Sequence, residues 1–281
     1  MHNSYKPSMH IVAAKSILAL LEKAFPKQIY KVFYDAAFSS YRVIIRFLYL
    51  RFWLSAVITG NSSARRKVNT VFRVMPYSLV GWRGLHATYD AVMDVQERWI
   101  SGDIVECGVA RGGSAALMSL LEALAGNHRK IWLFDSYEGL PEPTKDDFRA
   151  GISGRHVRPL PKGACLGTFG QVEDLLFRRL RLDRNSITMV KGWFQDTLPA
   201  MRSKIDHIAV LRIDADWYES VKCCLENMYD QVVLGGIIII DDYASCFGAQ
   251  AALDEFLAIQ KIGAVLLPDG RGGCIFRKPF V

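Results

Sequence analysis

The alternation of apolar and polar positions becomes regular beyond residue 101. Short apolar runs rich in Ile and Val alternate there with stretches whose apolar residues recur at helical spacing. Strands are predicted over 104–109, 131–135, 187–190, 208–213, 237–240, 264–267 and 273–277, and helices near 113–125, 171–181, 217–231 and 248–261. Strands that alternate with helices imply right-handed crossovers and a sheet buried on both faces. The predicted fold class is therefore α/β, a doubly wound, mostly parallel seven-stranded sheet.

The end of the chain departs from this alternation. Only the turn 268–272 separates the last two predicted strands, which is too short for a helical crossover, so an antiparallel hairpin is predicted at one edge of the sheet. By analogy at the level of the fold alone, a parallel sheet closed by such a hairpin is the arrangement of class I S-adenosylmethionine-dependent methyltransferases.

The first hundred residues are organised differently. Apolar residues at helical spacing predict helices over 10–25 and 85–100, and aromatic and cationic residues are interleaved over 29–58. The polar segment 61–67 is interpreted as an exposed linker. The predicted domains are a basic, aromatic-rich helical arm over 1–65 and the α/β domain over 66–281.

Charge separates these two parts of the chain. Residues 1–73 contain twelve Lys and Arg but only Glu22 and Asp35, a net charge of +10, whereas the whole chain carries +7. This charge favours a surface partner such as anionic lipid or an acidic neighbouring subunit, although a solvated face explains it equally well. No run is apolar enough to span a membrane. The arm is interpreted either as a lid or homo-oligomer element that packs on the domain, which is narrowly favoured, or as a peripheral membrane contact.

The six cysteines include no C-x-x-C pair and no Cys/His cluster at zinc spacing. Cys107 and Cys274 stand in apolar runs, where a reduced cysteine behaves as a small buried hydrophobe. No secretory signal is visible at the start, so a cytoplasmic location is predicted, at the membrane surface if the arm binds lipid. No nucleic acid partner is expected, because the basic residues cluster outside the α/β domain and no base-flipping motif is evident.

The ends of the predicted strands are acidic, and in open α/β sheets the ligand crevice lies beyond these ends. Glu106 precedes the glycine turn 108–113, whose G-x-x-x-G-G spacing disfavours the diphosphate of dinucleotides. The cationic sulfonium and ammonium groups of S-adenosylmethionine suit this edge better, with Glu106 near the methionine end and Asp135 at the ribose hydroxyls. Taken alone, Glu106 is also explained as a helix cap or a structural ion pair.

Two further strand ends carry Asp214, Asp241 and Asp242. Adjacent strand ends aim their side chains at one point, and hard oxygen ligands without His or Cys suit Mg²⁺. The alternative is that one of these aspartates caps a helix that starts near 217 or 248. A magnesium site is therefore predicted.

Five segments in consistent order give the α/β domain a specific resemblance. They are VECGVARGGS (105–114), FDSYEGLP (134–141), VKGWFQDTLP (190–199), RIDADWYES (212–220) and GGIIIIDDYASCFGAQAALDEF (235–256). From about residue 72 to 278 the chain resembles the macrocin/mycinamicin family of sugar O-methyltransferases, which also includes aminocoumarin tailoring enzymes. The arm, residues 1–65, is poorly covered by this resemblance.

The resemblance implies an S-adenosylmethionine-dependent O-methyltransferase with a Rossmann-like fold, a divalent metal on the three aspartates and Asp216 as general base. It implies a long substrate loop over 140–170. It also implies cofactor contacts from Glu106, Gly108, Ser114, Asp135 and Ser136. Family members usually carry a bulkier residue at the position of Ala110 and often Gly at that of Ala215, differences that bear on substrate fit.

A sugar hydroxyl is barely ionised at neutral pH, so its proton must be removed or shared. In the expected mechanism, Mg²⁺ chelates two neighbouring hydroxyls of a small-molecule or glycan acceptor and Asp216 accepts the proton. Two other functions are weighed. One is a metal-dependent glycosyl- or phosphoryl-group enzyme that uses Asp214-x-Asp216 and has only the isolated Arg111 and Arg271 for phosphate. The other is a non-catalytic methyltransferase-like binding module. The acidic strand ends argue against both.

Overall fold

The computed structural model describes residues 44–126, 129–148 and 159–279. The chain divides into two compact units, Met1–Thr59 and Gly60–Val281. In the first unit residues 44–58 form a helix, whereas the helix predicted over 10–25 lies outside the described residues. No helix in the described ranges has both the length and the apolar character needed to cross a membrane.

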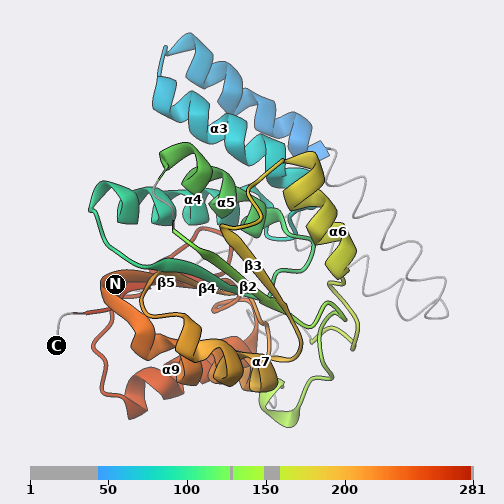
Figure 1. The fold of residues 1–281 in the computed structure, drawn as a ribbon, viewed down its shortest axis with the longest axis vertical. Helices are drawn as coiled ribbons and strands as arrows, with labels where there is room; N and C mark the ends of the chain where they lie inside the picture. The colour runs from blue at the N-terminus through green and yellow to red at the C-terminus, as the bar shows by residue number, and fades with distance from the viewer. Residues whose placement is uncertain (1–43, 127–128, 149–158, 280–281) are drawn as a thin grey trace. The chain divides into compact units, whose positions relative to one another are not determined.

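The second unit is a seven-stranded sheet with helices on both faces (Figure 1). The strands are β1 (Asp103–Cys107), β2 (Ile131–Asp135), β3 (Ile187–Lys191), β4 (Ile208–Ile213), β5 (Val232–Ile240), β6 (Leu267–Pro268) and β7 (Cys274–Arg277). Their order is β3-β2-β1-β4-β5-β7-β6, with parallel pairing from β3 to β5. β7 pairs antiparallel with β5 and with β6. The predicted doubly wound sheet with a C-terminal antiparallel hairpin is therefore confirmed.

The helices of this unit cover the sheet in two layers. They are α3 (Ser62–Val74), α4 (Gly81–Glu97), α5 (Gly113–Ala125), α6 (Phe169–Glu173), α7 (Phe194–Met201), α8 (Tyr218–Met228) and α9 (Phe247–Ile259). Figure 1 shows α4 and α5 over one face and α7 and α9 over the other. α8 packs against both α7 and α9. α6 continues directly into a π-helical segment, Asp174–Arg179, and the short 3-10 turns are Met75–Tyr77, Lys145–Asp147, Arg202–Lys204 and Tyr229–Gln231.

The linker predicted over 61–67 is wrong, because most of it is helix α3. Its polar residues are a helix start: the Asn61 side chain accepts a hydrogen bond from the Ala64 amide at 2.9 Å. Such an N-cap satisfies one of the free amides of the first turn. The boundary predicted near residue 65 therefore falls inside a helix, and the contacts of the chain divide it after Thr59.

Other differences trace to glycine and proline. α7 was not predicted, and it contains Pro199, which ordinarily ends a helix. β5 begins at Val232 instead of residue 237; it contains Gly235 at φ 78°, and the register with β4 shifts between Ile208 and Val210. β6 covers only Leu267–Pro268, not 264–267.

The turn after β1 is seated directly on the end of β4. Gly108 has φ +91°, and a Cβ at this position would lie 1.9 Å from the carbonyl oxygen of Asp214. Only glycine permits both this backbone conformation and this approach. The glycine turn and the acidic end of β4 are therefore held at a fixed separation.

We expect Gly108→Ala to lower the free energy of unfolding by roughly 2–4 kcal/mol, since the new methyl group must push the two strand ends apart. Urea unfolding followed by circular dichroism measures this loss. Gly263→Ala is the matched control, because a Cβ at Gly263 has no neighbour within 4 Å; it should change stability by less than about 1 kcal/mol. Equal stability of the two variants would contradict the close approach.

Candidate active site

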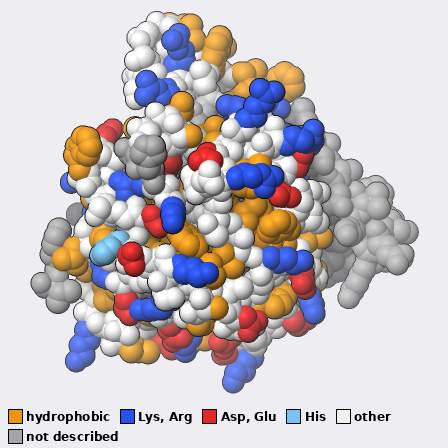
Figure 2. Space-filling model, in the orientation of Figure 1, with side chains coloured by type: hydrophobic (Ala, Val, Ile, Leu, Met, Phe, Trp, Pro, Cys, Tyr) orange, Lys and Arg blue, Asp and Glu red, His pale blue; other side chains and the backbone are white. Residues whose placement is uncertain are grey.

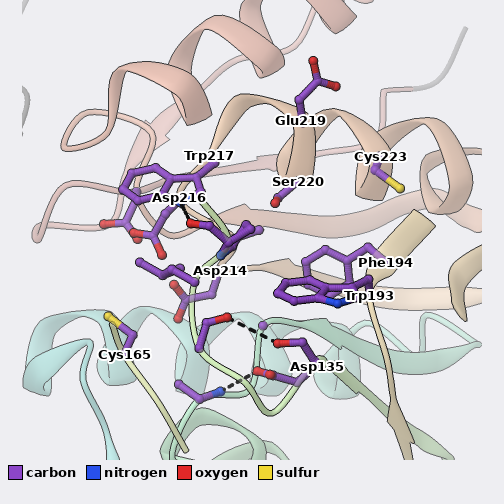
Figure 3. Close-up of a pocket in the computed structure, with 18 of the residues that line it drawn as sticks. Asp135, Cys165, Trp193, Phe194, Asp214, Asp216, Trp217, Glu219, Ser220 and Cys223 are labelled. Carbon is purple, nitrogen blue, oxygen red and sulfur yellow. Dashed lines mark hydrogen bonds between the residues drawn. The ribbon is translucent and has the colours of Figure 1, made fainter. Parts of the chain in front are cut away.

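A cavity of about 550 Å³ opens at the carboxyl ends of the parallel strands. Its lining includes six of the residues predicted from the sequence: Gly108, Asp135, Ser136, Asp214, Asp216 and Asp242. Figure 3 shows Asp214 and Asp216 at the cavity, with Trp217 on one side and Trp193 and Phe194 on the other. The edge of the sheet at which a ligand site was predicted is therefore hollow. One wall, here called the acidic wall, is formed by Asp214, Asp216 and Asp242, and aromatic side chains lie beside it.

The Asp135 carboxylate is bound to backbone amides of the glycine turn and of its own turn. Its Oδ2 accepts from the amides of Val109 at 2.7 Å and Ala110 at 2.9 Å, and its Oδ1 accepts from the amide of Tyr137 at 2.6 Å. Burial raises the pKa of Asp135, and these three amides oppose the rise. Asp135 therefore fixes the shape of the turn and still lines the cavity.

The two predicted serines differ in placement. Ser136 lines the cavity, and its Oγ accepts from the Glu138 amide at 3.1 Å and donates to the Gly139 carbonyl at 3.3 Å. Ser114 is buried in the first turn of α5, two residues after Gly112, and is absent from the lining. The first turn of α5 therefore lies behind the residues that line the cavity.

Glu106 does not reach the cavity wall. It is 1% exposed, and its Oε1 accepts a hydrogen bond from Arg212 at 3.0 Å, while its Oε2 is buried without a partner. Burial raises the pKa of Glu106 to about 8, and Arg212 opposes that rise. The structural ion pair weighed from the sequence is therefore present.

Arg212 was missed by the sequence analysis. It is fully buried in β4 and binds carboxylates at the ends of three strands: Glu106 of β1, Asp214 after β4 at 2.9 Å and Asp241 after β5 at 2.6 Å. The signal was available, because an arginine inside the apolar strand Ile208–Ile213 needs buried acids around it.

The three predicted metal ligands converge. Asp214, Asp241 and Asp242 each offer a carboxylate oxygen, and these three oxygens lie within 4.8 Å of one another. None of them caps a helix, since the N-caps of α8 and α9 are Trp217 and Cys246. The alternative reading of these aspartates as caps is therefore wrong. A set made only of hard oxygen donors at this separation fits a magnesium ion.

Arg271 reaches the same carboxylates from the hairpin. Its Nη1 pairs with Oδ2 of Asp241 and lies 3.4 Å from Oδ1 of Asp242, so the expectation that Arg271 is isolated is wrong. Asp269 fixes the loop beneath it, because its Oδ1 accepts from the amides of residues 271, 272 and 273. Both oxygens of Asp241 are thus already bonded to arginines.

Carboxyl groups outnumber guanidinium groups at this end of the sheet. Two guanidinium groups face five carboxyl groups, which are those of Glu106, Asp214, Asp216, Asp241 and Asp242. Burial, reinforced by neighbouring carboxylates, raises the pKa of Asp241 to about 8 in spite of both arginines. A divalent cation would relieve this repulsion.

Asp216 has the features of a residue held for function. Its backbone lies in the left-handed region at φ 55°, which is uncommon for a residue other than glycine. Burial, followed by the charges of Asp242 and Asp214, raises its pKa well above the ordinary range. The Cys246 thiol, also missed from the sequence, contacts Oδ1 of Asp216 at 3.6 Å. The carboxyl group therefore sits at the cavity as a comparatively strong proton acceptor.

Part of the expected substrate loop is tied to the site. Asp147 is buried; its Oδ2 accepts from the Thr144 amide at 2.7 Å, and its Oδ1 accepts from the Tyr218 amide at 2.7 Å. The Trp217 indole donates to the Pro141 carbonyl at 3.1 Å. Residues 149–158 of the predicted loop lie outside the described residues. The segment before them is thus fastened to the start of α8, beside Asp216.

The doubly wound sheet closed by the antiparallel strand β7, with a glycine turn after β1 and Asp135 ending β2, has the architecture of class I S-adenosylmethionine-dependent methyltransferases, as the match to a solved O-methyltransferase shows. Among solved structures, the O-methyltransferase NovP matches with a TM-score of 0.63 and 33% identity over 73% of this chain and 83% of that one. A calicheamicin methyltransferase, CalS11, shares the fold with a TM-score of 0.58 and 20% identity over 80% and 89% of the two chains.

The family follows from the sequence comparisons. The family model of macrocin O-methyltransferase matches residues 14–278. Demethyldecarbamoylnovobiocin O-methyltransferase of Streptomyces niveus is 32% identical over 78% of this chain and 83% of its own. Mycinamicin III 3''-O-methyltransferase of Micromonospora griseorubida is 27% identical over 74% and 80%. The chain belongs to the macrocin O-methyltransferase family, an enzyme family, and the predicted resemblance is confirmed. Its predicted extent is wrong, because the family model begins at residue 14 and therefore covers most of the arm.

The raised carboxyl pKa values give a prediction about pH. A carboxyl group whose pKa is higher in the folded state binds its proton more tightly there, so its contribution to stability is complete below the unfolded pKa near 4 and is lost as pH rises through about 8. In EDTA, we expect stability to fall between pH 5 and 9 by up to about 1.4 kcal/mol per pH unit for each such group.

Thermal unfolding across this pH range measures the effect, and Glu106→Gln is the diagnostic variant. Glutamine keeps the size of the side chain but does not titrate, so the fall in stability should be shallower in the variant than in the wild type. Identical slopes would show that Glu106 keeps an ordinary pKa.

Proposed function

We propose that this enzyme transfers a methyl group from S-adenosylmethionine to a hydroxyl group of a sugar or glycosylated small molecule, with Mg²⁺ on Asp214, Asp241 and Asp242 and with Asp216 as general base. The observation that carries the proposal is the convergence of three carboxylate oxygens within 4.8 Å, beside a fourth carboxyl group at the same cavity. The relatives support the acceptor class, because one of them, from Streptomyces olivaceus, is named as a 4'-O-methyltransferase of a rhamnosyl-tetracenomycin.

The chain's own groups define the roles at each end of the cavity. The amides of the glycine turn, fixed by Asp135, form the wall for the donor, and the aromatic side chains Trp193 and Trp217 provide apolar faces. Ser136 and Gly108 line the donor side, whereas Glu106 and Ser114 support it from behind. We therefore propose that Glu106 supports the glycine turn that binds the cofactor and does not contact the cofactor itself.

Proton removal falls to Asp216. A bound Mg²⁺ would supply a positive charge that makes an adjacent acceptor hydroxyl more acidic. Asp216 takes the proton from that hydroxyl, the acceptor oxygen forms its bond to the methyl carbon, and the electron pair of the breaking carbon–sulfur bond stays on sulfur. Alignment of oxygen, carbon and sulfur between the acidic wall and the glycine turn supplies much of the remaining acceleration.

Family membership argues against both alternative functions considered from the sequence. The matched family and relatives are O-methyltransferases, and none of them is a glycosyl- or phosphoryl-group enzyme or a non-catalytic module. Arg271, one of the two phosphate ligands considered, is paired with Asp241 and Asp242. The expected homo-oligomer stays a prediction, as does the peripheral membrane contact of residues 1–65.

Asp216→Asn is expected to lower the rate of methyl transfer by about 10²–10⁴-fold, because the amide cannot accept the proton. Binding of S-adenosylhomocysteine, measured by calorimetry, should remain within about threefold of the wild type, since Asp216 lies on the acidic wall and not in the glycine turn. Asp230→Asn, at an exposed surface position, is the control and should leave both quantities unchanged. Full turnover by Asp216→Asn would remove Asp216 from the role of base.

Removal of divalent ions should abolish methyl transfer while S-adenosylhomocysteine still stabilises the protein against heat. Asp242→Asn should weaken Mg²⁺ binding, measured by titration calorimetry without substrate, by at least about tenfold, because an anionic ligand is lost. Asp206→Asn serves as the control, since Asp206 lies at an exposed position before β4 and not among the convergent aspartates. Undiminished transfer in the presence of EDTA would exclude a metal from the reaction.

A further inference from the structure

The helix over residues 44–58 exposes far more apolar surface than its length accounts for. Eight of the sixteen large hydrophobic side chains that are exposed among the described residues lie in this one segment. They include Ile58, which is 82% exposed, and Phe47, which is 70% exposed. Single exposed hydrophobic residues are ordinary, but a cluster on one element marks a contact surface.

The exposed apolar residues are not confined to one face. Tyr49 and Ala56 are buried, which accounts for one stripe of the helix. Phe47, Leu54 and Ile58 recur at helical spacing on another side and are all exposed. A helix that is apolar around most of its circumference needs an apolar environment beyond one packing face. Its remaining surface must therefore be covered by something other than water.

Charge indicates what covers this helix. Its charged residues are Arg46 and Arg51, and the sequence contains no Asp or Glu from residue 36 to residue 89. The guanidinium of Arg51 lies 4.9 Å from the ring centre of Phe52, so the cation stays close to an apolar side chain. Figure 2 shows that Lys and Arg side chains also stand beside hydrophobic ones elsewhere on the surface. Arginine stems can lie along apolar surface while their charged ends reach polar headgroups. Two copies of this helix would bring like charges together, whereas an anionic lipid surface complements them.

The described part of the helix is too short to cross a bilayer by itself and suits an in-plane position. Residues 44–58 at 1.5 Å each span about 22 Å, less than the ~30 Å of a bilayer core, and two arginines interrupt the run. Trp53 and Phe47 are side chains that favour the boundary between headgroups and acyl chains. These features together describe a helix that lies in the membrane surface.

We propose that the helix over residues 44–58 is a membrane-docking element, inserted along its length into the headgroup boundary of a bilayer that contains anionic lipid. Apolar side chains such as Phe47, Leu54 and Ile58 enter the boundary region, and the positive charge of the segment attracts the anionic headgroups. The proposal does not depend on the identity of the methyl acceptor. It places the enzyme at a surface where lipid-linked glycans are within its reach.

The test is co-sedimentation of the full chain with vesicles of phosphatidylcholine alone or of phosphatidylcholine and phosphatidylglycerol in equal parts. We expect binding to the anionic vesicles that is at least tenfold tighter than binding to the neutral ones. The triple variant Phe47→Ser, Leu54→Ser, Ile58→Ser should lose at least tenfold of this affinity. The double variant Arg46→Gln, Arg51→Gln should lose most of the preference for anionic lipid.

A matched control removes three exposed hydrophobic residues from the second unit: Leu234→Ser, Ile259→Ser, Val265→Ser. It should bind vesicles within twofold of the wild type. Stabilisation of every variant by S-adenosylhomocysteine establishes that the second unit is folded. The proposal is overturned if the wild type stays in the supernatant with anionic vesicles, or if the control loses as much binding as the helix variant. It is also overturned if the triple variant dissociates a dimer without changing vesicle binding, which would make the helix a contact between copies.

Discussion

The candidate site depends on the buried guanidinium group of Arg212. Arg212 lies inside β4 without solvent exposure and holds carboxylates from β1, from β4 and from the end of β5. Removing one partner from a buried ion network leaves an uncompensated charge and typically costs about 3–5 kcal/mol, so the four groups are mutually required. Because these strands are neighbours, the ion network also fixes where their acidic ends point. The buried guanidinium of Arg212 is what offsets the cost of placing these carboxyl groups together at the end of the sheet.

The donor side is coupled to this wall through backbone contacts. Asp135 holds the glycine turn by its amides, and Gly108 in that turn rests on the carbonyl of Asp214. A shift of the turn would therefore move the acidic residues, and the reverse is also true. The proposed donor and acceptor sites are in this way held by one set of backbone contacts, as alignment of three reacting atoms requires.

The sequence contained most of the fold and much of the site, for identifiable reasons. The short apolar runs between helical segments predicted the strands. The rule that ligands bind at the carboxyl ends of parallel strands then predicted that Asp135, Asp214 and Asp242 lie at one cavity. Glu106 follows the same pattern along the chain, yet it points into the interior, because the direction of a side chain depends on a partner from another strand. Nothing local to Glu106 reveals that this partner is Arg212.

The elements that were missed depend on similar long-range facts. α7 forms in spite of Pro199, and Asn61 begins a helix where a linker was expected. Arg271 lines the cavity from the hairpin, and Cys246 stands at the start of α9. Each contacts an aspartate that is 30 residues away in the sequence, Asp241 for Arg271 and Asp216 for Cys246. Their contribution is a property of the assembled sheet and not of any window of residues.

The hairpin loop has a further consequence for how a cation reaches the acidic wall. Asp269 ties down three successive amides, so the backbone that bears Arg271 has little freedom, whereas the Arg271 side chain is 31% exposed. An incoming ion that claims the outer oxygen of Asp241 therefore has to displace a guanidinium by rotation about side-chain bonds. Such rotations take picoseconds to nanoseconds at exposed positions, whereas loop motions extend to microseconds. At the proposed metal site, admission of an ion would therefore require rotation of the Arg271 side chain and not movement of the hairpin backbone.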